Sequence, residues 1–292
     1  MGDTMTNQNF HISKKKKDDE YYTLYEDVEK ELLHYEEFLK DKTIFCNCDD
    51  ERSVFYLYFK NNFERLKLRC VYFIHHQDHG SSYLIRLSQH GETKSMLTGD
   101  GSFDSVESVD ILKMSDVVIT NPPFSLFRSF VDLLIGTGVF FLIIGNKGAI
   151  SYNSIFKYYL SGNLSLGYNT NNVTMNFKRP DGTTRSVPSY WYTNIPFKKD
   201  KKIIPSKSIN DIDRSYYDHT HILNINKLSD IPYDYFDLMG VPVTYLDKHN
   251  PDLFDVIGNT RCPDGCRFVK SINYIDGKEI YLRVIIKRKK TW

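Results

Sequence analysis

The sequence predicts an α/β protein with a mostly parallel central sheet, helices on both of its faces, and a β-rich, basic C-terminal part. The first observation is that apolar strand patterns alternate with helical stretches between residues 24 and 144, at the spacing of β-α-β units. The second is that short strands, turns and Asn- and Lys-rich loops replace this pattern after residue 160. The third is a content of 41% hydrophobic and 14% aromatic residues in 292, which excludes a disordered or collagen-like chain.

The spacing of apolar residues predicts the individual elements. Helices are expected over 24–40, 53–63 and 125–135. Buried strands are expected over 43–48, 70–74, 116–120 and 139–144. The two hairpins expected from turn residues join 83–87 to 94–97 through His90-Gly91, and 174–178 to 185–193 around Asp181-Gly182.

The charge of the chain is divided unevenly, although its formal net charge is only +1. Residues 1–150 carry 17 basic and 23 acidic side chains, whereas residues 151–292 carry 21 and 14. The densest stretch, from Lys178 to Arg214, holds nine basic residues and four acidic ones. A basic C-terminal half is typical of a surface that binds a polyanion. An ordinary solvated surface is the alternative interpretation.

Membrane and secreted classes are not favoured by the sequence. The longest apolar run, from Val139 to Ile144, has the length of a strand and is far shorter than the ~18 residues of a membrane span. The N-terminus is polar and then Lys-rich, without an apolar stretch of signal-peptide length. Five scattered cysteines, an odd number, are typical of a reducing compartment. We therefore expect a cytoplasmic protein that does not span a membrane.

The segment Asn121-Pro122-Pro123-Phe124 carries the strongest chemical signal. It directly follows an apolar strand, and open α/β sheets bind their ligands at the carboxyl ends of the strands. The prolines lock φ and remove two donors, so the backbone carbonyls around them stay available as acceptors. Asn121 adds a side-chain acceptor and Phe124 a flat apolar face, which together suit a planar ring with an exocyclic amino group. In the alternative interpretation, the prolines end the strand and Phe124 lies in the core.

With this context the chain resembles the EcoRI-type adenine-specific DNA methyltransferases, which use S-adenosylmethionine. The run Asn-Pro-Pro-Phe-Ser-Leu-Phe-Arg, from Asn121 to Arg128, carries the resemblance. Further segments resemble the family in the same order, so that residues 14–288 are covered. They are Lys17–Thr23, Cys46–Asp50, Gly99–Phe103, Phe141–Gly145, Trp191–Asn194 and Met239–Lys248. The resemblance implies a Rossmann-like class I methyltransferase fold and a target-recognition part at the basic end.

The resemblance also implies a division of the chain into parts. Residues 1–13 are expected to form a flexible N-terminus, and residues 14–162 the cofactor-binding and catalytic core. Residues 163–292 are expected to supply the remaining core strands and the DNA target-recognition region. The side chains expected to contact the DNA backbone are Lys198, Lys199, Lys201 and Lys202.

The residues implied as catalytic are Asn121, Pro122, Pro123 and Phe124, with Phe124 stacking on the target base. Trp191 and Tyr192 lie where such enzymes place a second aromatic residue against that base. Consecutive strand residues face opposite sides of a sheet, so at most one of the two rings can stack on the base while its neighbour enters the core. Which of them stacks, and whether both belong to the core, stays open at this point.

The cofactor implied by the resemblance is S-adenosylmethionine. The residues expected to bind it are Tyr22, Thr23, Asn47, Asp49, Asp50 and Asp100. The pair Tyr22-Thr23 would contact its methionine end, and Asp100 the amino group of its adenine. The segment from Asn47 to Asp50 lies where the glycine-rich cofactor loop is usual, but the glycines are missing, so the backbone must approach the cofactor differently. No ribose ligand is assigned, because only Gln77 and Asp78 are available after the second strand.

No metal site is expected. Cys262 and Cys266 lack a second Cys/His pair that would complete a tetrahedral zinc site. The neighbours His75 and His76 lack the helical spacing of a metal pair and are expected at the surface.

The expected reaction is transfer of a methyl group from S-adenosylmethionine to N6 of an adenine flipped out of double-stranded DNA. Direct transfer needs no side chain to remove a proton first, so it predicts a nearly flat pH dependence between about pH 6.5 and 8.5. The alternatives are an RNA adenine or protein glutamine methyltransferase, and a catalytically inactive sequence-specific DNA-binding protein. The expected partners are DNA and, within a restriction–modification pair, an endonuclease that acts separately, with the enzyme itself a monomer. The recognition sequence stays open.

Overall fold

The computed structural model describes residues 22–77, 81–170, 174–178, 184–198, 202–260 and 273–290. Two compact units make up the chain. The first comprises Met1–Ile150 with Ser165–Phe197, and the second Ser151–Leu164 with Lys198–Trp292.

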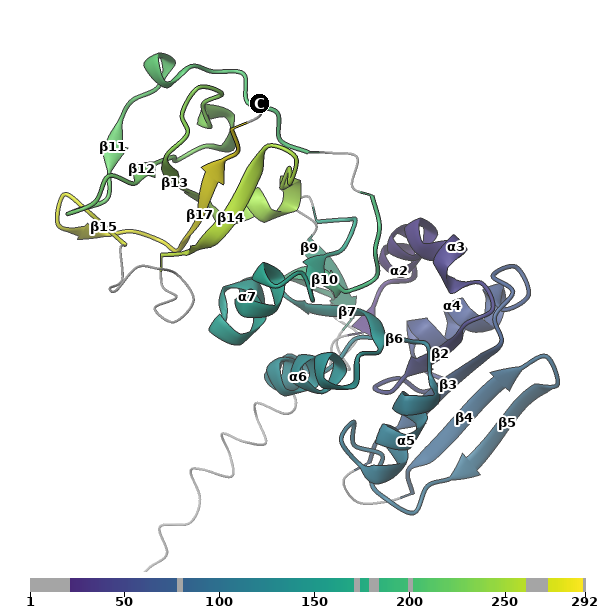
Figure 1. The fold of residues 1–292 in the computed structure, drawn as a ribbon. Helices are drawn as coiled ribbons and strands as arrows, with labels where there is room; N and C mark the ends of the chain where they lie inside the picture. Colours follow the sequence, from purple (N-terminus) through teal and green to yellow (C-terminus); the bar gives the residue numbers. More distant parts are fainter. Residues whose placement is uncertain are drawn as a thin grey trace, which may run out of the picture. The chain divides into compact units, whose positions relative to one another are not determined.

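The first unit is built on one sheet with the strand order β1-β9-β10-β7-β6-β2-β3-β4-β5, and β8 also pairs with β10 (Figure 1). Its strands are β1 (Tyr22–Thr23), β2 (Thr43–Cys46), β3 (Cys70–His75), β4 (Tyr83–Ser88), β5 (Gly91–Met96), β6 (Val117–Thr120), β7 (Phe140–Asn146), β8 (Ser165–Leu166), β9 (Thr174–Lys178) and β10 (Thr184–Thr193).

The centre of this sheet is parallel and its flanks are antiparallel. Strands β7, β6, β2 and β3 run in the same direction. Antiparallel strands follow on both sides, β10 beside β7 and the β4–β5 hairpin beside β3. The expected α/β class is therefore confirmed at the level of a mixed sheet with a parallel centre. The two expected hairpins pair as predicted, β4 with β5 and β9 with β10.

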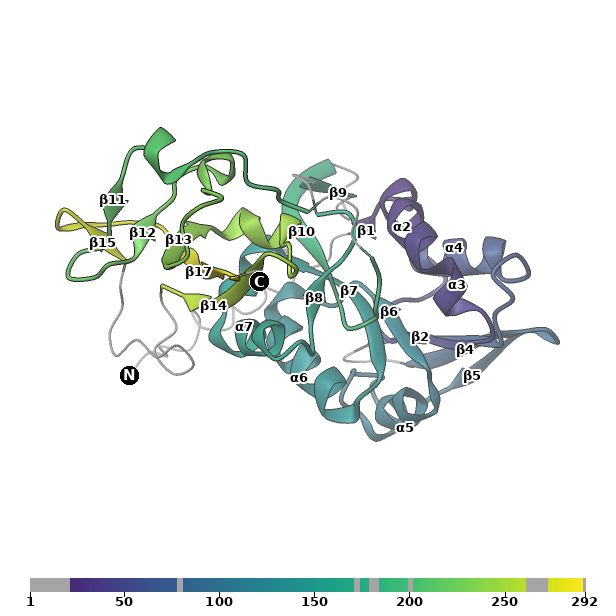
Figure 2. The same cartoon turned by 45° about the horizontal axis from the view of Figure 1, so that its top comes forward.

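Helices cover both faces of the sheet. The helices of the first unit are α2 (Tyr25–Leu32), α3 (Glu36–Leu39), α4 (Val54–Asn62), α5 (Val106–Met114) and α6 (Phe127–Thr137), with the 3-10 turns η1 (Leu33–Tyr35), η2 (Phe124–Leu126) and η3 (Lys147–Ser151). Figure 2 shows α2, α3 and α4 on one face, with α5 and α6 on the other. The sequence did not predict α5, and η1 interrupts the helix expected over 24–40.

Strand alternation divides the core between these two layers. On the α2 and α4 side, inward residues such as Ile44, Val71 and Leu142 form one cluster with the apolar residues of both helices. A buried carboxylate, Glu31 of α2, joins this layer to the chain after β8 by accepting the backbone N–H groups of Tyr168 (2.7 Å) and Asn169 (2.8 Å). Burial raises the pKa of Glu31, against the effect of these hydrogen bonds.

The second unit contains a five-stranded sheet with the order β11-β12-β13-β17-β14 and a separate β15–β16 pair. Its elements are α7 (Asn153–Leu160), β11 (Ser215–Tyr216), β12 (Leu223–Asn224), β13 (Leu238–Pro242), β14 (Phe254–Asn259), β15 (Tyr274–Ile275), β16 (Lys278–Glu279) and β17 (Arg283–Arg288), with the 3-10 turns η4 (Ile209–Asp211), η5 (Leu228–Asp230) and η6 (Val243–Lys248). Tyr217, Ile222 and Ile285 form the centre of a small core.

The division between the units is discontinuous, whereas the sequence suggested one boundary at residue 162. Helix α7 precedes that boundary but packs on β14 of the second unit. Strands β8 to β10 lie in the part that was expected to supply the remaining core strands, and they belong to the central sheet of the first unit. Contacts between distant parts of the chain, which composition does not reveal, decide these memberships.

Close packing between β7 and α6 generates a prediction about stability. A Cβ atom at Gly145 of β7 would overlap the ring of Phe127, whereas one at the exposed Gly136 of α6 would meet nothing within 4 Å. We expect Gly145→Ala to destabilise the protein by about 1–3 kcal/mol, because Phe127 must move. Gly136→Ala is the matched control and should stabilise it by less than about 1 kcal/mol. Urea denaturation of both variants measures the difference, and equal stabilities would contradict the prediction.

Candidate functional site

The candidate site lies where the central sheet reverses its strand order. From β2 the chain continues to β3 on one side, and from β6 to β7 on the other, so β2 and β6 are neighbours at the point of reversal. Such a switch point leaves a crevice at the carboxyl ends of the two strands, where open α/β sheets bind ligands. The segments that leave these ends are Asn47–Asp50 and Asn121–Phe124. The fold thus brings two predicted site motifs side by side.

The carboxylate of Asp49 connects the two segments. Its Oδ2 accepts a hydrogen bond of 2.5 Å from the hydroxyl of Thr120, the last residue of β6. The backbone N–H of Asn121 and the hydroxyl of Ser53 also donate to this carboxylate. Asp49 and Thr120 are both buried, so the contact is shielded from water. Through these hydrogen bonds, Asp49 connects the segment after β2 to the first residue of the Asn-Pro-Pro-Phe segment.

Burial controls the protonation of Asp49. Loss of hydration raises the pKa of its carboxyl from 3.8 to about 7, with a further upward contribution from the charge of Asp50. Hydrogen bonds from Thr120, Ser53 and Asn121 oppose this rise. The charged and neutral forms of Asp49 are consequently both populated near neutral pH.

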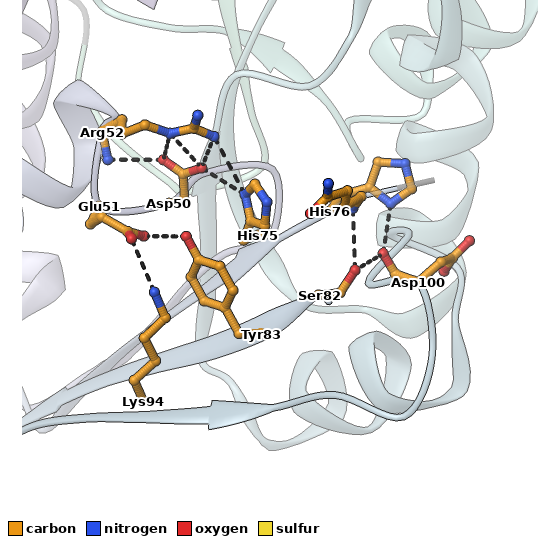
Figure 3. Close-up of polar contacts among 10 residues, drawn as sticks. Asp50, Glu51, Arg52, His75, His76, Ser82, Tyr83, Lys94 and Asp100 are labelled. Atoms are coloured by element: carbon orange, nitrogen blue, oxygen red, sulfur yellow. Dashed lines mark hydrogen bonds and ion pairs between the residues drawn. The ribbon is translucent and has the colours of Figure 1, made fainter. Parts of the chain in front are cut away.

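The next residue, Asp50, is held by two basic side chains (Figure 3). Arg52 donates its backbone N–H (2.8 Å) and its guanidinium group to the carboxylate, and Nδ1 of His75 lies 2.8 Å from Oδ2. Burial raises the pKa of Asp50, but the hydrogen bonds from Arg52 and His75 outweigh it and hold the pKa below its ordinary value. His75 was expected at the surface; instead it is mostly buried and stacks on Tyr83 at 4.6 Å between ring centroids.

The β4–β5 hairpin holds the same loop from the other side (Figure 3). The hydroxyl of Tyr83 donates to Glu51 at 2.6 Å, and Lys94 donates to the other oxygen of that carboxylate at 3.1 Å. The Lys94 ammonium group also lies 3.4 Å from the centroid of the Tyr83 ring. Side-chain contacts, in place of the missing glycines, therefore define the course of the chain after β2.

Asp100 lies beside the carboxyl end of β3 (Figure 3). Its backbone carbonyl accepts from Ser82 Oγ (2.5 Å) and from the N–H of Gln77 (3.2 Å), and lies 2.8 Å from His76 Nδ1. Its side chain is exposed and accepts the N–H of Ser102, a hydrogen bond that holds the carboxyl pKa below its ordinary value. Asp100 and Gln77 thus share the strand edge that bears the two motifs. Asp78 lies outside the described residues.

The Asn-Pro-Pro-Phe segment leads from β6 into α6. Pro123 has φ −53° and precedes the turn η2, which begins at Phe124. Pro122 is buried, whereas Phe124 is partly buried and packs against the core cluster on the α4 side. The oxygen Oδ1 of Asn121 is shielded from solvent. The segment is thus anchored through its prolines and keeps part of the Phe124 ring accessible.

The Tyr22-Thr23 motif forms β1, which pairs with Phe177 and Lys178 of β9. Strand β9 pairs with residues 184–188 of β10, and these extend past Ser189, the partner of the last residue of β7. The Tyr22-Thr23 strand therefore lies beyond the carboxyl end of β7. The other predicted site residues lie at the same edge of the sheet.

Trp191 and Tyr192 are both buried in the core of the first unit, on opposite faces of β10 as strand alternation predicts. Trp191 packs edge-on against Phe55 of α4, and Tyr192 packs against Phe127 of α6. The Tyr192 hydroxyl donates to the Asn146 carbonyl at 2.8 Å. In this structure neither ring has an open face for a base, which agrees with the alternative that both belong to the core.

Of the four lysines expected to contact DNA, Lys198 and Lys202 are described, and Lys199 and Lys201 lie outside the described residues. Lys198 is exposed. Lys202 forms an exposed ion pair with Asp252 at 2.8 Å, a contact that salt screens and that contributes little to stability.

The residues around Asn47 fit a polar ligand. Asn47 is buried after β2, and its Nδ2 atom has no hydrogen-bond partner within the described part of the chain. A buried donor without an acceptor destabilises a fold, so a ligand that supplies an acceptor suits this position. Among the described residues, no group of three His, Cys, Asp or Glu side chains could hold a metal ion. The described helices also include none with the length and apolarity to cross a membrane.

Sequence reasoning missed four residues that hold this site together. They are Arg52, Ser53, His75 and Thr120. Ser53 had a local signal, because a serine before a helix is a preferred N-cap, and its Oγ does accept the N–H of Tyr56. The roles of the other three depend on partners far away in the chain, and no local pattern indicates them.

A site of this kind, with an Asn-Pro-Pro-Phe segment at the switch point of an α/β sheet, defines an amino-methyltransferase. The family described as the adenine-specific methyltransferase EcoRI matches residues 9–289, and the chain belongs to this family. It is 35% identical to the Type II methyltransferase M.EcoRI of Escherichia coli, over 99% of both chains. It is 34% identical to M.MgeORF184P of Mycoplasma genitalium and to M.MpnI of Mycoplasma pneumoniae, over 96% of this chain and 98% of each relative. No solved structure matches the chain.

The buried Asp49 generates a prediction about stability and pH. We expect the free energy of unfolding of the wild type, relative to Asp49→Asn, to fall as the pH rises from about 4 to about 7. In the unfolded chain this carboxyl titrates near 3.8, and in the folded protein at about 7. Between these values the folded state binds a proton that the unfolded state has released, so a higher pH favours unfolding. Urea denaturation across this range measures the difference; a difference that grows with pH would contradict the assignment.

Proposed function

We propose that this chain transfers a methyl group from S-adenosylmethionine to N6 of an adenine flipped out of double-stranded DNA, within a specific site. The observation that carries the proposal is the position of Asn121–Phe124 beside Asn47–Asp50, at the switch point of the sheet. Family membership supports the adenine specificity. The Type II names of the three relatives support DNA as the substrate.

The cofactor is proposed to lie along the carboxyl ends of β2 and β3, as in a Rossmann-like class I methyltransferase. When bound, S-adenosylmethionine supplies an electrophilic methyl group on a sulfonium sulfur. Asn47, whose buried Nδ2 donor has no partner among the described residues, is the best supported ligand. Asp100 keeps an exposed carboxylate beside β3, which suits an adenine amino group. The backbone of Tyr22-Thr23 on β1 follows the same edge, in agreement with a role at the methionine end.

Asn121 and Pro122 are proposed to activate the target amino group. The N6 lone pair of adenine is delocalised into the ring, which makes it a poor nucleophile. Acceptance of its hydrogens by Asn121 Oδ1 and the Pro122 carbonyl favours a pyramidal nitrogen with a localised lone pair. The prolines fix the direction of these acceptors. Positioning of the nitrogen in line with the methyl group contributes the rest of the acceleration.

Phe124 is proposed to stack on the flipped base. Extrusion of a base from the duplex costs a few kcal/mol, and stacking in the pocket offsets part of this cost. Phe124 is suited to the role because its ring is only partly buried. Trp191 and Tyr192 are not included in the proposed base pocket, because both are buried in the core.

The DNA backbone is proposed to lie against the basic second part of the chain. Lys198, Lys199, Lys201 and Lys202 would neutralise phosphates there, and Lys202 would exchange its exposed partner Asp252 for a phosphate. The surrounding region, residues 198–292, would recognise the target sequence. The enzyme would act as a monomer in the cytoplasm, and any cognate endonuclease would act separately.

Modified-base sequencing of DNA from cells that express this chain tests the proposal. N6-methyladenine at one recurring sequence motif is the expected result. Methylated RNA or protein, with unmodified DNA, would favour the other substrate classes. No methylation together with sequence-specific DNA binding would indicate an inactive binding protein.

We expect Asn121→Ala to lower the single-turnover rate of methylation by on the order of a hundredfold or more, because it removes an acceptor that acts on the reacting nitrogen. Cofactor affinity, measured by calorimetry, should stay within a few-fold of the wild type. Asn61→Ala, at an exposed position of α4, is the matched control and should keep the full rate. A rate loss of less than tenfold in Asn121→Ala would remove Asn121 from the catalytic residues.

We expect Phe124→Ala to weaken capture of the flipped base, whereas Phe124→Tyr should retain much of it, since any flat ring provides stacking. Stacking of a base on an aromatic ring contributes roughly 1–3 kcal/mol. Fluorescence of 2-aminopurine at the target position reports base flipping. Phe140→Ala, in a partly exposed ring at the first residue of β7, is the control. Equal flipping signals in the wild type and Phe124→Ala would exclude Phe124 from the base pocket.

A further inference from the structure

The surroundings of Asp49 differ from those of a cofactor ligand. Its carboxylate receives hydrogen bonds from three separate places: Ser53 at the N-terminus of α4, Thr120 at the end of β6, and the backbone of Asn121. The side chain is 7% exposed, and Thr120 is fully buried. A carboxylate with three internal donors has little remaining capacity to accept from a ligand. Its contacts connect it to the catalytic segment instead.

We propose that Asp49 is a positioning residue that holds Asn121 in place for methyl transfer, and that Asp49 does this in its ionised form. This inference rests on the function proposed above. It differs from the expectation that Asp49 binds the cofactor, a role that the segment from Asn47 to Asp50 retains through Asn47.

The geometry explains why one contact can orient the segment. The N–H of Asn121 is the first donor beyond the last residue of β6, and the two residues after Asn121 are prolines without N–H groups. The backbone from 121 to 123 therefore has a single N–H group with which to be anchored, and Asp49 accepts it. Thr120 fixes the carboxylate from within the sheet at 2.5 Å. A shift of about 1 Å in the acceptors would misalign the target nitrogen and lower the rate strongly.

Ionisation of Asp49 follows from the same contacts. A carboxylate accepts all three donors, whereas a neutral carboxyl must donate its own hydrogen, so that one of the two hydroxyls has to turn from donor to acceptor. The groups that face it are Asp50, which opposes its ionisation, the buried thiol of Cys46 at the end of β2, and the partly buried thiol of Cys48 two residues further on. Arg52 and His75 bind Asp50 and so reduce its effect on Asp49. The donors from α4 and β6 are the neutral hydroxyls of Ser53 and Thr120.

Thr120→Val and Thr120→Ser test the contact without removing the acid. Valine has the shape of threonine but no hydroxyl, whereas serine retains the donor. We expect Thr120→Val to lower the single-turnover rate by about tenfold or more and Thr120→Ser to keep it within about threefold. Cofactor affinity, measured by calorimetry, should stay within about threefold in both variants. Thermal unfolding verifies that each variant is folded.

The variant Asp49→Asn provides the second test of the inference. We expect a rate loss of about tenfold or more at pH 8, with cofactor affinity within about threefold of the wild type. Addition of Thr120→Val to Asp49→Asn should cause little further loss, because both changes break the same contact. The wild-type rate should fall about tenfold from pH 8 to pH 6, and the Asp49→Asn rate should be flat. Direct transfer alone predicts a flat profile, so the fall reports Asp49.

Three outcomes would overturn the inference. They are wild-type rates in both Thr120→Val and Asp49→Asn, a flat wild-type pH profile, and a loss of cofactor affinity of more than about tenfold in Asp49→Asn but not in Thr120→Val. The last result would make Asp49 a cofactor ligand. Failure of the proposed function is a separate result, since it would appear as absence of adenine methylation by the wild type itself.

Discussion

The hydrogen bond from Thr120 to Asp49 is the contact on which the rest of the site depends. It joins the two strands at which the strand order of the sheet reverses, at the edge where both predicted motifs emerge. Because both residues are buried, water does not compete for this contact, and the low local dielectric strengthens it. The same burial makes the carboxylate costly to ionise, which places its pKa at about 7. Burial of Asp49 therefore both strengthens its contact with Thr120 and makes the charge of its carboxyl group sensitive to pH.

The chain after β2, where the cofactor loop is expected, lacks the usual glycines and is supported in another way. A glycine-rich turn lets the backbone approach a ligand closely, whereas the chain after β2 carries the charged side chains of Asp50, Glu51 and Arg52. These residues bind His75 of β3 and Tyr83 and Lys94 of the β4–β5 hairpin. The hairpin thus supports the loop through side chains. Much of the polar capacity of Asp50 and Glu51 is used in these contacts, whereas the buried Nδ2 donor of Asn47 has no partner among the described residues and so remains to be satisfied by a ligand.

The fold was predictable wherever one local pattern decides the structure. Apolar runs located the four parallel strands, and turn residues located both hairpins. The sequence did not reveal that β4 runs antiparallel to β3, because the apolar pattern of a strand does not specify its direction. It also did not reveal that α7 packs with β14 of the second unit. Both features depend on contacts between residues far apart in the chain.

The sequence by itself determined the Asn-Pro-Pro-Phe motif, its place after a buried strand, and membership of the adenine-specific methyltransferase family. These follow from residue order, because proline restricts its own backbone and strand patterns are local. Only the tertiary structure decided what the neighbouring side chains do. It assigned Asp49 to Thr120, Asp50 to Arg52 and His75, and both Trp191 and Tyr192 to the core. The physical reason is that the partners of a buried polar or aromatic group are set by strand order and burial, and Asp49 and Thr120 become neighbours only when β2 and β6 pair across 71 residues of sequence.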